Sequence, residues 1–256
     1  MALPAFIEQG QGDVVLLLHG IGGGKTIWAG SLSALASAGY RAVAMDFPGY
    51  GDSPGTPTLQ AMVDSVLALL DHLGAERSAL VGHSMGGMVA QELVAAAPRR
   101  VQSLVLACTS SAFGKADGDW QARFVAERLA PLDAGLGMAG MAAQLVPAMV
   151  APAAAPEALA ASIAVMARVP EASYRSALRA IAAFDRRSAL ADIRIPTLCL
   201  AGEHDRTAPP EVMQRLAQRV TGAEYRCLPD AGHIANVEQP EAFNAAVIDF
   251  LRRTLP

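Results

Sequence analysis

The sequence of 256 residues has only three cysteines, Cys108, Cys199 and Cys227, which lie far apart. Without a Cys-x-x-Cys pair or a regular spacing there is no disulfide framework, so we expect a reducing compartment and a cytoplasmic location. All three cysteines fall in apolar runs typical of buried strands, which predicts inert core thiols. A His-Glu-x-x-His motif and a Cys/His cluster are also lacking, so no metal site is predicted.

Excess positive charge is lacking too. Lysine and arginine number 20 against 24 aspartates and glutamates, a net charge of -4. Nucleic-acid binding needs a basic face that replaces phosphate counterions, so we expect no such partner. Residues 1–9 lack the basic region and long apolar core of a signal peptide. Residues 134–156 are uncharged and long enough to cross a bilayer, but glycines and prolines interrupt them repeatedly, which favours packed helices and no membrane partner.

What the chain does have is an alternation of short apolar runs and helix-like segments. Residues 14–18 are a continuous apolar run, too short for a typical helix. Similar runs recur at 41–46, 79–81, 104–107, 197–201 and 225–228. Helical segments separate them and end at glycine or proline. This alternation predicts a doubly wound, mostly parallel α/β sheet.

The alternation stops between about residues 110 and 190. Four helical segments are predicted there, at 120–129, 137–150, 156–169 and 171–184. We therefore divide the chain into a core of residues 1–110 and 190–256 and a helical insertion of residues 111–189. The insertion is expected to lie over the loop end of the sheet.

One face of the second inserted helix is rich in methionine. Met138, Met141, Leu145 and Met149 share a helical face, a spacing that is more typical of a buried core stripe than of a dedicated binding site. We nevertheless take Met138, Met141 and Trp28 as candidate substrate-binding residues, with core packing as the alternative for each.

The stretch from Leu80 to Gly87 reads as strand, sharp turn and helix, with Ser84 at the apex of a G-x-S-x-G pentapeptide. This motif is typical of a nucleophile elbow, in which the turn lifts the serine hydroxyl clear of the sheet. Gly82 and Gly86 are needed because the turn is strained and brings strand and helix close together. Taken alone, the pentapeptide also fits an ordinary Gly-Ser turn.

A nucleophilic serine needs a base to take its proton, and the base needs an acid to orient it. Asp205 follows a predicted strand and His233 follows the last one, so these residues and Ser84 fall at carboxyl ends of strands, where ligands gather. We predict Ser84 as nucleophile, His233 as base and Asp205 as acid. Glu203 and Asp230 lie nearby, and we assign them to loop solvation or capping.

Acyl transfer places negative charge on a carbonyl oxygen, which backbone N–H groups must stabilise. We expect one donor from Met85 and the second from Ile21, with Gly22 as the alternative. Residues 20–26 also look like a phosphate-binding loop, but with His19 before them the motif is one residue short. Nucleotide binding is therefore not predicted, and no cofactor is expected.

Together these pieces resemble the α/β-hydrolase superfamily. The matching stretches are 18–20, 46–53, 82–87, 202–205 and 232–233. The resemblance implies an α/β-hydrolase fold whose insertion is a cap over the active site. A serine at position 84 argues against the dehalogenase and epoxide hydrolase branches, whose nucleophile is aspartate. Few residues precede Val14, so the family's leading β-hairpin is expected to be short or partly missing.

Within the superfamily the chain looks most like small bacterial carboxylesterases and enol-lactonases, to which residues 113–115 and 128–132 bear a faint likeness. We predict a serine hydrolase that cleaves a small carboxylic ester or lactone through an acyl-enzyme. The enzymatic alternatives are a C–C bond hydrolase of meta-cleavage products and a cofactor-free haloperoxidase or perhydrolase. A ligand-binding receptor on the same fold is the alternative outside enzymes. The acyl and alcohol groups and the oligomeric state stay open.

Overall fold

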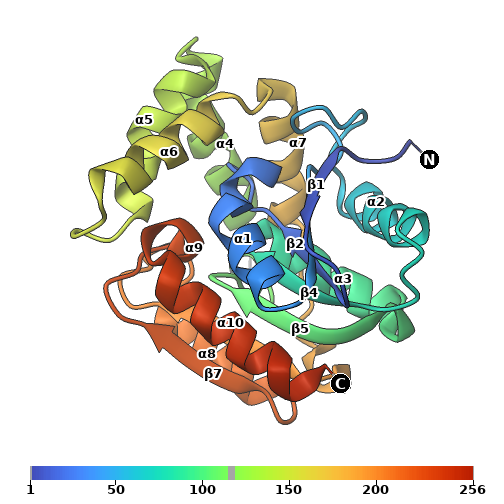
Figure 1. The fold of residues 1–256 in the computed structure, drawn as a ribbon. Helices are drawn as coiled ribbons and strands as arrows, with labels where there is room; N and C mark the ends of the chain where they lie inside the picture. Colours follow the sequence, from blue (N-terminus) through green and yellow to red (C-terminus); the bar gives the residue numbers. More distant parts are fainter. Residues whose placement is uncertain (1, 115–118, 256) are drawn as a thin grey trace.

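The computed structural model describes residues 2–114 and 119–255, and a seven-stranded sheet forms its frame (Figure 1). The strands lie in the order β1-β3-β2-β4-β5-β6-β7. β1 runs antiparallel to β3, and the other neighbours pair in parallel. The strands are β1 (Phe6–Gln9), β2 (Val14–Leu18), β3 (Arg41–Met45), β4 (Ser78–His83), β5 (Val101–Ala107), β6 (Thr197–Gly202) and β7 (Glu224–Leu228).

Helices cover both faces of this sheet. Every residue of β2 is buried, and its side chains alternate between two apolar clusters. The covering helices are α1 (Ala29–Ser37), α2 (Leu59–His72), α3 (Met85–Ala96), α8 (Pro210–Arg219), the short α9 (Ala235–Glu238) and α10 (Pro240–Thr254). Leu16 and Leu18 face the cluster that includes α2, α3 and α8, whereas Val15 and Leu17 face the one that includes α1 and α10. The doubly wound, mostly parallel sheet predicted from the sequence is confirmed.

In the described part of the chain between β5 and β6, four further helices gather on one side of the molecule (Figure 1). They are α4 (Trp120–Asp133), α5 (Gly137–Met149), α6 (Pro156–Ala167) and α7 (Glu171–Ala182). Each occurs where a helix was predicted. An isolated antiparallel bridge between Ala112 and Asp185 joins the two ends of the insertion. Lys115, within the stretch 113–115 that resembles the enol-lactonases, lies outside the described residues.

Two details differ from the sequence analysis. β1 was not predicted, because this four-residue edge strand is only partly buried and lacks a continuous apolar run. Cys227 is exposed, so its prediction as a core thiol is wrong, whereas Cys108 and Cys199 are buried. The reason is that β7 lies at the edge of the sheet, where few of its side chains are covered.

The segment tested for membrane insertion, residues 134–156, forms α5 and the turns beside it. In the part of the chain that the structure describes, no helix is both long and apolar enough to span a bilayer.

Where β2, β4 and α3 meet, the backbone leaves no room for side chains at positions 82 and 86. A Cβ atom on Gly86 would lie 2.2 Å from the carbonyl oxygen of Leu18, and one on Gly82 would lie 2.5 Å from the carbonyl oxygen of Gly86. Glycine at both positions therefore lets the first turn of α3 approach the sheet.

Gly86→Ala should lower the free energy of unfolding by about 1–3 kcal/mol, because backbone atoms must move to accommodate the methyl group. Gly30→Ala, in α1, is the matched control: apart from its chain neighbours and its own helix backbone, no described atom lies within 4 Å of the added Cβ. Gly30→Ala should raise the free energy of unfolding by up to about 1 kcal/mol, because alanine favours a helix more than glycine does. Urea unfolding of both variants measures the difference, and equal effects would contradict the close approach.

Candidate active site

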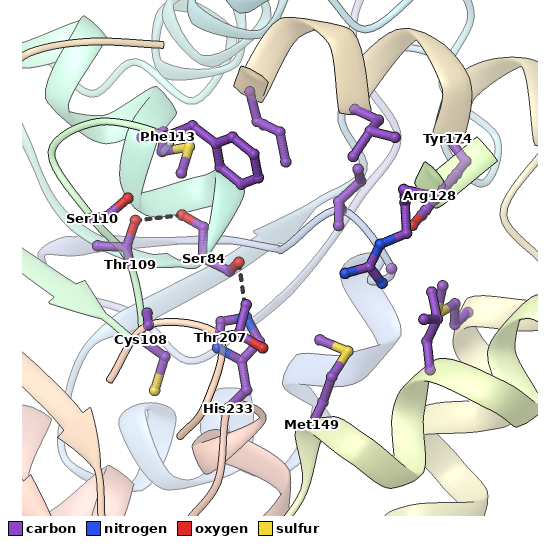
Figure 2. A pocket seen from close by; sticks show the side chains of 18 of the residues that line it. Ser84, Cys108, Thr109, Ser110, Phe113, Arg128, Met149, Tyr174, Thr207 and His233 are labelled. Atoms are coloured by element: carbon purple, nitrogen blue, oxygen red, sulfur yellow. Dashed lines mark hydrogen bonds between the residues drawn. The ribbon is translucent and has the colours of Figure 1, made fainter. Parts of the chain in front are cut away.

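Ser84 lies at the sharp turn between β4 and α3, with backbone angles φ of 52° and ψ of -115°. A positive φ is strained for a residue with a side chain, and such residues persist only where neighbours fix them. The Ser84 N–H donates to the carbonyl of Ala107 at 2.9 Å, and the Thr109 hydroxyl donates to the carbonyl of Ser84 at 2.7 Å (Figure 2). The end of β5 and the residues just after it therefore hold the turn.

His233 connects Ser84 to Asp205. Its Nε2 atom lies 3.0 Å from Ser84 Oγ, and its Nδ1 atom lies 2.9 Å from Asp205 Oδ2 (Figure 2 shows the first of these bonds). The side chains of His233 and Asp205 are almost completely buried. The other oxygen of Asp205 accepts the N–H groups of Thr207 at 2.7 Å and Ala208 at 2.8 Å, which fixes the carboxylate plane.

The protonation state of Asp205 decides which nitrogen of His233 carries hydrogen. Burial acts to raise the pKa of Asp205, but His233 and the N–H groups of Ala208 and Thr207 together hold this pKa below its usual value. The carboxylate is therefore ionised and accepts a hydrogen bond from Nδ1–H. That leaves the lone pair of Nε2 facing the Ser84 hydroxyl, so the arrangement can take a proton from serine.

The loop after β2 lies against Ser84. A Cβ atom on Gly20 would lie 3.2 Å from Ser84 Cβ. Within the described residues, the N–H groups of Ile21 in this loop and of Met85 at the start of α3 donate to no acceptor. The Tyr50 hydroxyl donates to the carbonyl of Ile21 at 3.0 Å, which orients the next peptide, between Ile21 and Gly22. Both N–H groups are available for a ligand near Ser84.

Lys25 anchors the same loop to the residue that follows β3. Its backbone N–H donates to Asp46 Oδ1 at 2.7 Å, and its Nζ atom donates to Asp46 Oδ2 at 2.5 Å. His19 acts as a second brace: Nδ1 donates to the carbonyl of Gly20 at 2.7 Å, and Nε2 accepts the N–H of Phe47 at 3.1 Å. Burial lowers the pKa of His19 to about 4, so the ring is neutral near pH 7.

Glu238 is a buried residue that sequence reasoning missed. Its carboxylate accepts the N–H groups of Gly232 at 2.9 Å, Ile234 at 2.9 Å and Ala151 at 2.6 Å. Gly232 and Ile234 flank His233, and Ala151 lies just after α5. Glu238 therefore fixes the histidine loop and joins it to the insertion. No sequence motif marks such a glutamate, since its role depends on a segment 87 residues away.

Two further contacts hold the backbone of His233. Its N–H donates to the carbonyl of Met149, the last residue of α5, at 2.7 Å. Its carbonyl accepts a hydrogen bond from Nε2 of His83 at 2.7 Å. His83, the residue before Ser84, is itself buried. Burial and the neighbouring His233 lower the pKa of His83 to about 3.

Ser84 and His233 border a cavity of about 120 Å³, shown in Figure 2. The insertion supplies much of its wall, mainly through apolar side chains. The lining residues from α4 to α7 are Phe124, Arg128, Leu145, Met149, Met166, Tyr174, Leu178 and Ile181. A small, largely apolar ligand therefore fits against Ser84 better than a highly charged one.

The three predicted substrate-binding residues do not line this cavity. Trp28 is fully buried beneath the site, with its ring 6.1 Å from that of Phe243. Met138 and Met141 pack in the apolar core. The spacing of the methionines identified a buried helix face correctly, but only the later part of that face, at Leu145 and Met149, reaches the cavity.

Among the described residues, Glu203, His204 and Asp230 are the group that could hold a metal ion. All three are exposed, and the backbone N–H of Asp230 donates to Glu203 at 3.1 Å. Exposed acidic groups commonly gather without an ion. We assign no metal to this loop.

The fold and the site together define a hydrolase of the α/β class. A family model described as the alpha/beta hydrolase fold matches residues 13–240, so the chain belongs to this family. It is an enzyme family, and its hydrolases act on small molecules.

The chain is similar to other members of this family in sequence and in structure. A protein named "Putative carbamate hydrolase RutD" from Variovorax paradoxus (strain S110) is 36% identical over 252 residues, which cover 94% of this chain and 92% of the relative. "3-oxoadipate enol-lactonase 2" from Acinetobacter baylyi is 30% identical, with 95% and 91% covered. The crystal structure of an enol-lactonase from Burkholderia xenovorans LB400 superposes with a TM-score of 0.87 at 28% identity, over 97% of this chain and 96% of that one.

The low pKa of His83 predicts an acid-sensitive fold. Below its ordinary pKa of 6.5 the unfolded chain protonates this histidine, whereas the folded protein does so only near the lowered pKa of about 3. Stability should therefore fall as pH drops from about 6.5 toward 3, with up to about 1.4 kcal/mol per pH unit from this group.

His83→Gln should make the decline between pH 6 and 4 shallower, since glutamine does not titrate. Urea unfolding at several pH values measures the slope. His72→Gln is the control, because His72 is exposed at the end of α2. An unchanged slope in His83→Gln would show that the buried ring is not kept neutral.

Proposed function

We propose that this protein is a serine hydrolase that cleaves a small carboxylic ester or lactone. The observation that carries the proposal is the hydrogen-bonded series Ser84–His233–Asp205 at the wall of a small apolar cavity. The three residues come from three separate strand ends, and their order and roles match those of a catalytic triad.

In the proposed reaction, Ser84 Oγ attacks the carbonyl carbon while His233 Nε2 takes the hydroxyl proton. The N–H groups of Met85 and Ile21 donate to the oxyanion of the tetrahedral intermediate. The intermediate collapses, and His233 returns the proton to the leaving alcohol oxygen. A water molecule then attacks the acyl-enzyme with His233 as base, which releases the carboxylic acid and restores Ser84. Asp205 stays ionised and stabilises the charged imidazole. The chemistry needs no cofactor.

We also propose that residues 111–189 act as a cap. The support is that α4 to α7 supply one wall of the cavity and that Met149 and Ala151 bond to the histidine loop. A mostly apolar wall excludes water and strengthens the electrostatic interactions at the serine.

Carbamate hydrolysis is a second candidate. It is favoured by the relative at 36% identity, whose printed name contains that activity. A carbamate also has a carbonyl carbon that a serine can attack, so the same residues would serve. C–C bond hydrolysis and haloperoxidase or perhydrolase chemistry are kept as alternatives, whereas the receptor hypothesis loses support because the relatives are named as enzymes.

We propose a cytoplasmic location as well. Cys108, Cys199 and Cys227 are all free, and an exposed free thiol such as Cys227 suits a reducing compartment.

Ser84→Ala and His233→Ala should each lower kcat by about 10³-fold or more in hydrolysis of p-nitrophenyl acetate and of a γ-lactone, as removal of triad members does. His204→Ala is the matched control, because this histidine is exposed beside Asp205 and lies outside the cavity lining. It should keep nearly full activity.

Near-normal turnover in either folded site variant would refute the assignment. Product analysis on an ester, a lactone, a carbamate and a meta-cleavage product separates the candidate reactions, since each releases a different pair of products.

A further inference from the structure

A charged side chain lines the mainly apolar cavity. Among the described lining residues, Arg128 from α4 is the only lysine, arginine, aspartate or glutamate. Figure 2 shows its guanidinium pointing inward, toward the space in front of Ser84 and His233. The cavity therefore places a cation on the side of the insertion and a nucleophile on the side of the sheet.

Within the described residues, the surroundings of the Arg128 guanidinium are aromatic rather than acidic. Among the described residues no carboxylate forms an ion pair with it; instead its Cζ atom lies 5.3 Å from the centre of the Phe124 ring, and its guanidinium lies close to the phenol of Tyr174. Arg175 on α7 is different, since it pairs with Glu171 at 2.8 Å and Asp133 at 2.6 Å. A half-buried cation without a carboxylate partner is costly, and a ligand anion would offset that cost.

The shape of the Arg128 guanidinium indicates which anion it would bind. Guanidinium presents parallel N–H donors that match the two oxygens of a carboxylate. A phosphate dianion usually gathers several cations or backbone donors, but the described lining residues supply one arginine within a mainly apolar wall. A carboxylate on a short carbon chain satisfies both the cation and the apolar lining.

We propose that Arg128 binds a free carboxylate of the substrate, so that the substrate is an ester or lactone bearing a second, ionised carboxyl group. This inference rests on the proposed function, since it assumes that Ser84 attacks the ester carbonyl. Two fixed points, one at Arg128 and one at Ser84, would hold the carbonyl in position for attack.

The test compares matched esters that differ in one charge. Monomethyl esters of succinate, glutarate and adipate carry the free carboxylate, and the corresponding dimethyl esters lack it. Arg128→Gln should lower kcat/KM for the best monoester by about 10- to 100-fold, the effect expected of a charged hydrogen-bonded pair. It should change kcat/KM for the dimethyl ester by no more than about threefold. Arg128→Lys should recover part of the loss, because lysine restores the positive charge but not the paired N–H donors of guanidinium.

Arg123→Gln is the matched control, because Arg123 lies on the same helix but is exposed and does not line the cavity. It should leave both esters unaffected. If the wild type hydrolyses neutral esters but gains nothing from the carboxylate, or if Arg128→Gln slows both esters equally, the carboxylate site is wrong and the hydrolase assignment stands.

A binding measurement keeps the two proposals separable if no ester is hydrolysed. Calorimetric titration of Ser84→Ala with monomethyl glutarate should show binding that weakens at least about tenfold when Arg128→Gln is added. That result supports the anion site without relying on catalysis. Binding that is absent, or the same in both variants, would overturn it.

Discussion

The close approach of β4, α3 and the loop after β2 at Ser84 is the constraint on which the rest of the site depends. Only glycine fits at positions 82 and 86, because backbone carbonyls occupy the space that a Cβ would need. The same approach forces Ser84 into a positive φ and leaves the N–H groups of Met85 and Ile21 without partners in the described structure. One packing requirement thus supplies both a hydroxyl at the cavity wall and two donors beside it.

His233, which faces Ser84, is held by hydrogen bonds to both its ring and its backbone. Asp205 orients its ring, while Met149 and His83 bond to its backbone on either side. Glu238 fixes the neighbouring peptides and also the chain after α5. Since Met149 itself lines the cavity, the residues that would contact substrate are linked to the base by two short hydrogen-bonded paths. A change in the insertion can therefore alter the position of His233 as well as the shape of the cavity.

Local patterns in the sequence were enough to predict the sheet and the residues grouped around Ser84. Apolar runs of β2 to β6 are continuous because both faces of these strands are buried, and Asp205 and His233 could be placed because strand ends meet at one edge. β1 and the exposure of Cys227 were missed because edge strands are only partly covered. Glu238 and the direction of Arg128 depend on contacts between distant segments, which no local pattern encodes. For the same reason, Trp28, Met138 and Met141 were recognised as apolar but not as lying outside the cavity.

The central claim is that Ser84 is a nucleophile activated by His233. Reaction of the folded protein with a fluorophosphonate, followed by peptide mapping in a mass spectrometer, tests it directly. The account predicts one phosphonylated residue, Ser84, with labelling abolished in Ser84→Ala and strongly slowed in His233→Ala. A folded wild-type protein that stays unlabelled at Ser84, or that is labelled as fast without His233, would contradict it.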